Sequence, residues 1–352
     1  MKYLSNLSRV KVFLRDPDKK SLLKIIKEFT VLAFHKKEIP FYYFKFLYKT
    51  QVTNYLDYIG LKEQQLITTD IRLHNPEYNS LINHKLFFGL FHEKSELNIP
   101  KQIGYNFASV FFFNNKTIHI KSKAELIGFF ETVFNTTNID GLFFRPPSDY
   151  GGRGCFKITK DKLTEAVNDK YEIFMRDTLV HTEVIKQHEA INSINKNSIN
   201  TLRMVTLVAA DNTVEIVSAL MRFGVGNSVI DNASSGGFFV GINIEKGTLK
   251  DSGHFLQEHS GRDVYEHPDS GVKFKDFKVP FFKEACDIVL KGVTIIPVRL
   301  IGWDVAITEN GPVIIESNSR IHIPVSDMAY GGLLQNEHVR KVFKELKTNA
   351  LS

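Results

Sequence analysis

Residues 302–320, GWDVAITENGPVIIESNSR, place an aspartate before an apolar run and a glutamate and an asparagine after a second one. Residues 305–308 and 312–315 have the apolar, partly β-branched composition of short strands. Residues 309–311 lie between them and predict a three-residue loop in which the glycine takes a positive φ. The stretch therefore predicts an antiparallel hairpin.

The length of this loop decides which residues face each other. With three residues in the loop, Asp304 lies directly opposite Glu316, and Asn318 shares their face. The other face then carries four apolar side chains, those of Val305, Ile307, Val313 and Ile315. A two-residue turn would mix Val305 with Glu316 on one face, so we prefer the three-residue loop.

The polar face of the hairpin suggests a metal site. Two opposed carboxylates repel each other and weaken a hairpin unless a cation lies between them. Two carboxylates and an amide oxygen form a set of hard ligands that suits Mg²⁺ or Mn²⁺. We therefore expect Asp304, Glu316 and Asn318 to bind metal ions. A solvated acidic patch at a sheet edge is the alternative that the hairpin alone leaves open.

The general composition is that of a globular protein. The 352 residues suffice for two or three subdomains, and 43% of them are hydrophobic and 24% charged. No apolar run approaches the roughly 20 residues that span a membrane, and the N-terminus lacks a secretory signal pattern. Cys155 and Cys286 are the only cysteines, which gives no disulfide framework. We expect a cytoplasmic protein.

Positive charge is concentrated at the N-terminus. Residues 1–50 contain twelve Lys or Arg and four Asp or Glu, a net +8, whereas the whole chain carries +6. Residues 22–37 combine helical apolar spacing with lysines, which predicts a helical cap on the main domain with solvated lysines. Contact of residues 1–60 with the inner face of a membrane is the alternative. Nucleic acid is not expected, because no nucleic-acid motif accompanies the charge.

The rest of the chain mixes helices with antiparallel strand pairs. We expect helices in residues 84–94, 122–134 and 336–349, strands in residues 110–113 and 141–146, and two strands in residues 201–224 around Asp211 and Asn212. Ser122 is placed to cap the second of these helices. Without a βαβ rhythm, this order predicts an α+β fold rather than a doubly wound sheet.

A glycine-rich stretch lies between two expected strands. Residues 143–158, FFRPPSDYGGRGCFKI, contain Gly151, Gly152 and Gly154 and place Arg145 just before them. Such glycines let backbone N–H groups wrap phosphate oxygens, although a plain hairpin loop also explains them. The stretch lacks the pattern of a P-loop and is followed by a strand, so neither a P-loop nor a dinucleotide-binding motif applies. Protein-kinase motifs are missing as well.

The order of these features resembles the ATP-grasp superfamily. Lys85 comes early, Arg145 closes a strand before the glycines, the stretch HTEVIKQHE follows, and the Asp, Glu-x-Asn set comes last. The closer resemblance is to the ATP-grasp branch associated with sugar transfer and polysaccharide biosynthesis, and it covers about residues 80–330. It is carried by IKQHEAINSINKNSINTLRMVT, MRFGVGNSVIDNASSGG, EHPDSGVKF and IGWDVAITENGPVIIESN.

This resemblance implies a fold in which two α+β subdomains clasp ATP and Mg²⁺. We accordingly expect a basic, mainly helical segment in residues 1–75. The first subdomain, with the glycine-rich loop, should then occupy residues 76–185, and the second, with the metal site, residues 186–345.

The resemblance also implies roles for single residues. Contacts to the α- and β-phosphates of ATP would come from Lys85 and Arg145, although the superfamily usually has lysine at the second position. The loop over the triphosphate would be formed by Gly151, Gly152 and Gly154. The hinge whose backbone binds adenine would be Glu183, Val184, Ile185 and Lys186, and Glu189 would bind the ribose hydroxyls. Magnesium would be bound by Asp304, Glu316 and Asn318.

Three arginines are candidates for catalysis. Arg203 and Arg222 lie in expected strands, where a buried arginine without an anion is costly, so we expect at least one to face a phosphate or carboxylate. By the resemblance, Arg320 completes an E-x-N-x-R pattern and could reach the γ-phosphate or an acyl phosphate. His188 is either a base or a hydrogen-bonded core histidine, and we prefer the core.

The reaction implied by the resemblance is carboxylate activation. The γ-phosphoryl group of ATP would move to a small-molecule or saccharide carboxylate, and an amine donor would displace phosphate from the acyl phosphate. Such a ligase would act in surface polysaccharide or cell-envelope biosynthesis. The alternatives are an ATP-grasp phosphotransferase and a non-catalytic partner of a membrane or glycosyltransferase. The sequence leaves the oligomeric state open.

Overall fold

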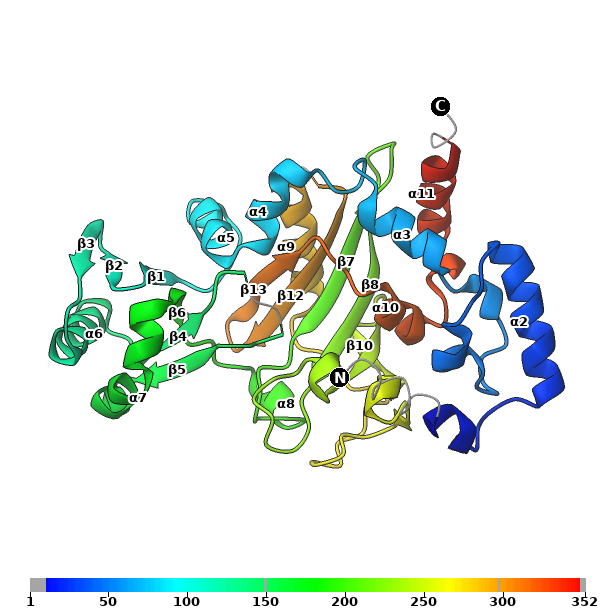
Figure 1. Cartoon of the computed structure of the whole chain (residues 1–352), viewed down its shortest axis with the longest axis horizontal. Coiled ribbons are helices and arrows are strands. Elements are labelled where there is room, and N and C mark those ends of the chain that lie inside the picture. The colour runs from blue at the N-terminus through cyan, green and yellow to red at the C-terminus, as the bar shows by residue number, and fades with distance from the viewer. Residues whose placement is uncertain (1–10, 149–150, 297, 349–352) are drawn as a thin grey trace.

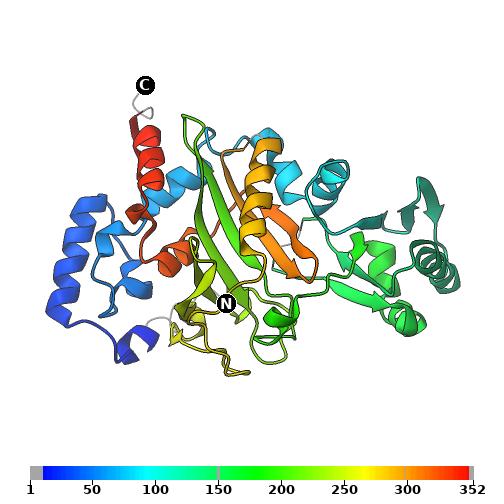
Figure 2. The same ribbon diagram turned by 180° about the vertical axis from the view of Figure 1, so that it is seen from behind.

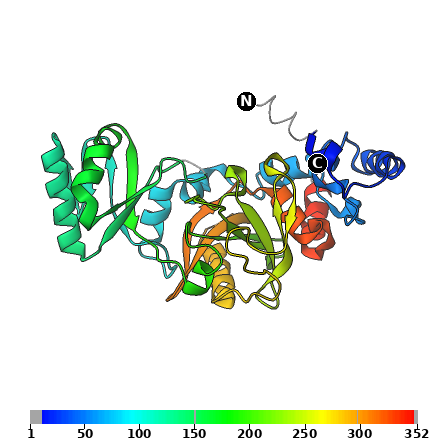
Figure 3. The ribbon, with the colours of Figure 1, turned by 90° about the horizontal axis from the view of Figure 1, so that it is seen from below.

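The computed structural model describes residues 11–148, 151–296 and 298–348. Three regions follow one another along the longest axis of the molecule (Figure 1). A lobe built on the first sheet lies at one end, a lobe built on the second sheet lies in the middle, and helices from the start of the chain lie at the other end (Figures 1 and 3). We call these the first lobe, the second lobe and the N-terminal segment, which comprises residues 11–75.

The first lobe contains a six-stranded sheet of order β3-β2-β1-β6-β4-β5, in which all neighbouring pairs are antiparallel. Its strands are β1 (Gln102–Phe107), β2 (Val110–Phe113), β3 (Lys116–His119), β4 (Gly141–Arg145), β5 (Phe156–Thr159) and β6 (Thr178–Glu183). Helices α6 (Lys123–Thr137) and α7 (Leu163–Arg176) pack on the sheet. Phe130, Phe144 and Phe174 surround the ring of His181 in this core.

The second lobe contains a seven-stranded sheet of order β11-β10-β9-β8-β7-β12-β13, again antiparallel throughout. Its strands are β7 (Leu202–Val208), β8 (Val214–Phe223), β9 (Phe238–Asn243), β10 (Thr248–Phe255), β11 (Asp263–Val264), β12 (Leu300–Thr308) and β13 (Gly311–Asn318). Because alternate residues of a strand point to opposite faces, both faces of β7 and β8 supply core side chains.

Helices cover both faces of the second sheet. Helix α9 (Phe282–Ile295) packs on the face seen in Figure 2, where a Cβ on Gly292 would lie 2.5 Å from the Trp303 ring. This close approach requires glycine. Helices α10 (Ile323–Tyr330) and α11 (Glu337–Thr348) pack on the opposite face. The short helices α4 (Asn79–Asn83), α5 (Lys85–His92) and α8 (Glu189–Asn192) lie near the junction of the lobes.

The N-terminal segment is helical, as expected. It contains α2 (Leu22–Lys36), which packs on the segment around Tyr55–Asp57, and α3 (Leu61–Thr69), which packs beside α11 (Figure 1). The expectation of solvated lysines is wrong in part, because buried ion pairs hold three of them. These pairs are Lys20–Glu28, Lys36–Glu63 and Lys49–Asp263.

Short single-turn segments connect these elements. They are η1 (Tyr43–Leu47), η2 (Tyr55–Asp57), η3 (Pro76–Tyr78), η4 (Lys160–Lys162), η5 (Ala233–Ser235), η6 (Gln257–His259) and η7 (Leu333–Gln335). Among the residues that the structure describes, no helix combines the length and apolar character needed to cross a membrane.

The other predicted elements and the α+β class are confirmed. Helices α5, α6 and α11 and strands β2 and β4 all lie within two to three residues of their expected bounds. Ser122 caps α6 by accepting a hydrogen bond from the Glu125 N–H at 3.2 Å. Strands β7 and β8 are joined by a turn in which Asn212 takes a φ of 64°.

The hairpin of β12 and β13 has the predicted acid pair but not the predicted loop. Asp304 lies opposite Glu316, whereas Thr308 lies opposite Gly311, which leaves a loop of only two residues, 309 and 310. A bulge at residue 315 lets both pairings coexist, because the extra residue shifts the register by one. Ile314, not Ile315, consequently faces Val305 in the core.

Candidate functional site

The end of the β12–β13 hairpin holds the predicted metal ligands. Asp304 is only 3% exposed, and Asn318 is also buried. The Asn318 Nδ2 lies 3.5 Å from the Glu316 Oε1, so the two side chains share one side of β13. The structure thus brings the three predicted ligands together.

Asp304 is bound by two arginines from neighbouring strands. Its Oδ2 accepts hydrogen bonds of 2.9 Å from both Arg203 on β7 and Arg222 on β8. Arg203 lies directly opposite Asp304 in the sheet. The expectation that at least one arginine faces a carboxylate is therefore confirmed for both, and their charge offsets the repulsion between Asp304 and Glu316.

Two further cations reach β13 from elsewhere in the chain. Lys85, the first residue of α5, places its Nζ 3.3 Å from the Glu316 Oε2. Arg145, the last residue of β4, donates a hydrogen bond of 3.1 Å to the Ile315 carbonyl. The Lys85 N–H also donates to the Pro147 carbonyl at 2.8 Å, which ties α5 to the segment after β4. The cluster therefore joins the two lobes.

Arg145 is buried and incompletely satisfied. Its Nε makes no hydrogen bond, and its guanidinium makes no ion pair, with any other residue in the described ranges. Burial lowers the pKa of this guanidinium, although the nearby Glu316 opposes the shift. A buried cationic donor without an acceptor is costly and indicates an anionic ligand.

The two acids at this site are shifted in opposite directions. Burial raises the pKa of Asp304 against the opposing charges of Arg203 and Arg222. Burial also acts on Glu316, but the charges of Lys85 and Arg203 outweigh it and hold the pKa of Glu316 below its ordinary value. Glu316 is consequently ionised at neutral pH.

The glycine-rich loop connects β4 to β5 and packs against the second lobe. Gly151, Gly152 and Gly154 have φ values of 72°, 73° and 66°, which other residues rarely adopt. A Cβ on Gly152 would lie 3.3 Å from Ile230, and one on Gly151 would lie 3.0 Å from the Asn232 Nδ2. The loop thus lies close to the second lobe on the side of the candidate site.

Residues 184–201, which include α8, connect the first sheet to the second. Glu183 ends β6 and accepts a hydrogen bond of 2.9 Å from the Lys101 N–H, while the His188 N–H donates to the Ile307 carbonyl at 2.8 Å. Between these anchors, the N–H groups of residues 184–186 donate to no other described residue. Glu189 is exposed at the start of α8, where its carboxylate accepts a hydrogen bond from Asn192.

Two candidates are placed differently from the expectation. Arg320 is exposed and forms no hydrogen bond or ion pair with the rest of the described chain, so it does not join the cluster. His188 is half-buried rather than a core residue. Its Nδ1 accepts a hydrogen bond of 3.0 Å from the Ala190 N–H and caps α8 at the surface.

Sequence reasoning missed Asp231. Its Oδ2 accepts hydrogen bonds from the N–H and the hydroxyl of Thr201, at 2.9 and 2.6 Å, and lies 3.4 Å from the Arg222 Nε. Asp231 therefore gives Arg222 a second carboxylate beside Asp304. The sequence did offer a signal for this residue, because Asp231 is the only charged residue between Arg222 and Glu245.

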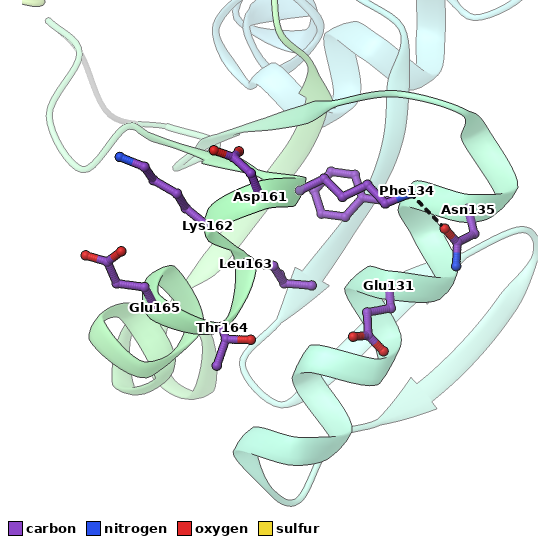
Figure 4. Close-up of a pocket in the computed structure, with 9 residues that line it drawn as sticks. Glu131, Phe134, Asn135, Asp161, Lys162, Leu163, Thr164 and Glu165 are labelled. Atoms are coloured by element: carbon purple, nitrogen blue, oxygen red, sulfur yellow. Dashed lines mark hydrogen bonds between the residues drawn. The ribbon is translucent and has the colours of Figure 1, made fainter.

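A hollow on the first lobe is unrelated to this cluster. It encloses about 490 Å³ between the end of α6 and the start of α7, and none of the candidate residues lines it (Figure 4).

In the described ranges, no three or more His, Cys, Asp or Glu side chains form a group that could hold a metal ion. Asp304 and Glu316 are two such side chains, and Asn318 adds an amide.

The chain matches a known protein family over most of its length. Residues 72–342 match the family described as sugar-transfer associated ATP-grasp. No curated protein matches the chain. The matched range contains all the candidate site residues.

Solved structures with a similar arrangement include three ligases or synthetases. D-alanyl-alanine synthetase A from Vibrio cholerae is 14% identical with a TM-score of 0.45, over 78% of this chain and 66% of that chain. N5-carboxyaminoimidazole synthetase from Staphylococcus aureus, complexed with ADP, is 10% identical with a TM-score of 0.45, over 76% and 53%. ATP-grasp ligase PsnB, complexed with precursor peptide PsnA2 and AMPPNP, is 11% identical with a TM-score of 0.42, over 80% and 63%. The chain thus spans 53% to 66% of the length of these structures.

Proposed function

Because the chain belongs to the sugar-transfer associated ATP-grasp family, as its sequence resemblance predicted, we propose that it is an ATP-dependent carboxylate–amine ligase. It would form ADP and phosphate through an acyl phosphate. The observation that carries this proposal is the cluster at the end of the hairpin, where Asp304, Glu316 and Asn318 meet four cationic side chains from both lobes. These cations are Lys85, Arg145, Arg203 and Arg222.

ATP would bind between the two lobes. The free N–H groups of residues 184–186 can donate to adenine, and the exposed Glu189 carboxylate can accept from the ribose hydroxyls. Lys85 and Arg145 would bind the α- and β-phosphates, and the unsatisfied Nε of Arg145 supports an anion there. Gly151, Gly152 and Gly154 would direct backbone N–H groups at the triphosphate.

The hairpin fits a magnesium site. Its ligands would be Asp304, Glu316 and Asn318, which supply two carboxylates and an amide oxygen from one end of the hairpin. When bound, Mg²⁺ would neutralise charge on the phosphoryl group that is transferred. Asp304 now accepts hydrogen bonds from both Arg203 and Arg222. As a ligand of Mg²⁺ it would bind these two arginines less strongly, and they could then bind an anionic substrate.

The reaction needs no nucleophile from the protein. An oxygen of the acceptor carboxylate would attack the γ-phosphorus while the bond to the ADP oxygen breaks. The amine would then attack the acyl carbon, the bond to the phosphate oxygen would break, and the departing phosphate would take up the proton. Arg203 and Arg222 would stabilise the oxyanion formed at the acyl carbon.

The acceptor is proposed from the character of the site and from the family. The surplus of cations favours an anionic acceptor, and association of the family with sugar transfer favours a saccharide carboxylate such as a uronic acid. The enzyme would then serve surface polysaccharide synthesis. We also retain the division into residues 1–75, 76–185 and 186–345 as a proposal, which the separate sheets of residues 102–183 and 202–318 support.

The proposal is tested by trapping the intermediate. Hydroxylamine in place of the amine should yield a hydroxamate in step with ADP when uronic acids and other carboxylates are screened. Glu316→Gln should abolish turnover, whereas Glu215→Gln, a carboxylate on the same sheet outside the cluster, should retain it. A stable phosphate ester would instead identify a phosphotransferase, and AMP with pyrophosphate would identify an adenylating enzyme. Unaltered turnover in Glu316→Gln would refute the metal site.

A further inference from the structure

Helix α2 exposes a row of large apolar side chains. Leu22, Leu23, Ile26 and Phe34 are 69%, 82%, 62% and 80% exposed, and we call them the α2 face. Helical spacing places all four on the side of α2 away from the protein. The side that packs on the protein carries Ile25, Glu28, Leu32 and Lys36. A concentrated set of exposed apolar side chains marks an interaction surface.

The exposed charges of α2 and of its C-terminal cap are all positive. Lys24 and Lys27 are exposed on α2, and Lys37 is exposed at its C-terminal cap. The only acid of α2, Glu28, is buried, where it accepts hydrogen bonds from Lys20 at 2.6 Å and from the Tyr43 hydroxyl at 2.7 Å. No exposed carboxylate of α2 therefore neutralises these lysines.

We propose that α2 docks on an anionic membrane surface. The α2 face would enter the boundary between headgroups and acyl chains, and Lys24, Lys27 and Lys37 would lie at the lipid phosphates. A helix with one apolar side flanked by lysines has the character of an interfacial helix, and the positive flank complements an anionic leaflet. This surface is separate from the proposed ligase site and does not depend on it.

A second copy of the chain fits this surface less well. Two α2 faces packed together would bring Lys24 and Lys27 of one copy near the same lysines of the other, and α2 has no exposed acid to compensate. An anionic lipid surface avoids this repulsion.

The position of α2 suits docking of the whole molecule. It lies at the end of the molecule away from the first lobe (Figures 1 and 3). Lys36 joins α2 to Glu63 at 2.7 Å, and the Ile59 N–H donates to Asp327 on α10 at 2.9 Å. These buried contacts connect α2 through the N-terminal segment to the second lobe. Docking would therefore leave the junction of the lobes open to solvent.

Co-sedimentation of the full-length protein with vesicles tests the proposal. We expect binding to phosphatidylcholine–phosphatidylglycerol vesicles, weakened by salt, and none to phosphatidylcholine alone. Combined Lys24→Gln, Lys27→Gln and Lys37→Gln should weaken binding on the order of a hundredfold, at about fivefold per lysine. The charge-matched control is Lys94→Gln, Lys116→Gln and Lys121→Gln, all exposed away from α2, and it should change binding little.

The apolar part of the surface has its own variant. Leu23→Ser with Phe34→Ser should weaken binding about tenfold or more, whereas Phe107→Ser, which removes an exposed phenylalanine from the first lobe, should not. Equal binding to neutral vesicles, or equal loss in the two lysine variants, would overturn the proposal. Failure of the full-length protein to bind any vesicles would also overturn it. If the protein then forms a dimer that Leu23→Ser with Phe34→Ser dissociates, the α2 face would instead bind a second copy of the chain.

Discussion

Buried cations are partnered differently in the N-terminal segment and at the junction of the lobes. Lys20 has a carboxylate of its own, Glu28 at 2.6 Å, and Lys36 is paired with Glu63 at 2.7 Å, whose other oxygen pairs with the exposed Lys347. At the junction, the half-buried Arg203 and Arg222 share Asp304, and Arg222 also pairs with Asp231. Arg145 there forms no ion pair with any described residue.

This difference separates charges that hold the fold from charges that suit a ligand. A one-to-one buried pair is neutral and complete, so it requires nothing further from solvent or substrate. A cluster with shared acids and an unsatisfied donor is costly without an anion, and such clusters concentrate at functional sites. We therefore expect variants of the N-terminal segment to lose stability alone, and variants of the junction to lose activity.

Asp304→Asn should have the largest effect. It leaves the half-buried guanidinium groups of Arg203 and Arg222 without their shared, buried carboxylate, so the free energy of unfolding should fall by about 3–5 kcal/mol. ATP turnover should be lost as well. Urea unfolding and an ADP-release assay measure the two effects. Full stability in this variant would mean that the arginines do not depend on Asp304.

Glu28→Gln should affect stability alone. Lys20 and the Tyr43 hydroxyl both donate to the Glu28 Oε2, so its neutralisation should cost about 2–3 kcal/mol of unfolding free energy. Turnover per folded molecule should be unchanged, and Lys27→Gln on the exposed side of α2 should change stability by less than about 0.5 kcal/mol. A loss of turnover per folded molecule in Glu28→Gln would contradict the view that the buried charges of the N-terminal segment only hold the fold.

His181 offers a buried titratable group with no charge partner. Its Nε2 donates to the Asn106 Oδ1 at 2.9 Å, and burial lowers its pKa to about 3. Because this folded-state pKa is below the unfolded value of about 6.5, stability is complete above pH 6.5 and declines as the pH falls toward 3. The decline should reach about 2 kcal/mol at pH 5.

Urea unfolding across this pH range measures the effect of His181. His181→Phe should flatten the dependence between pH 6.5 and 5, because the phenylalanine cannot bind a proton. An unchanged slope in His181→Phe would assign the pH dependence to other groups.

Arg145→Met should have the smallest effect on stability, and in the opposite direction. Removing a buried guanidinium without a carboxylate partner should raise the free energy of unfolding by about 1 kcal/mol. ATP affinity, measured by calorimetry, should fall at the same time. Arg145→Lys, the residue usual in the superfamily, should retain binding. A loss of stability in Arg145→Met would place Arg145 among the structural cations.

The sequence by itself determined the features that depend on neighbours in the chain. Alternation of apolar and polar residues predicted the hairpin and the pairing of Asp304 with Glu316, and Ser122 before an apolar periodicity predicted the capped start of α6. The order of short motifs predicted the family, which the match over residues 72–342 confirmed. Such local signals need no knowledge of how strands are ordered in a sheet.

Only the tertiary structure decided the contacts between distant segments. The meeting of Arg203 and Arg222 on Asp304 follows from the sheet order β8-β7-β12, and the bulge at residue 315 is a departure from regular pairing that a rule based on loop length does not predict. Helix α2 is apolar on two sides, and periodicity cannot tell which side the protein covers. The physical reason is common to all three cases: burial depends on which elements become neighbours, and the free energy of that choice is summed over the whole chain.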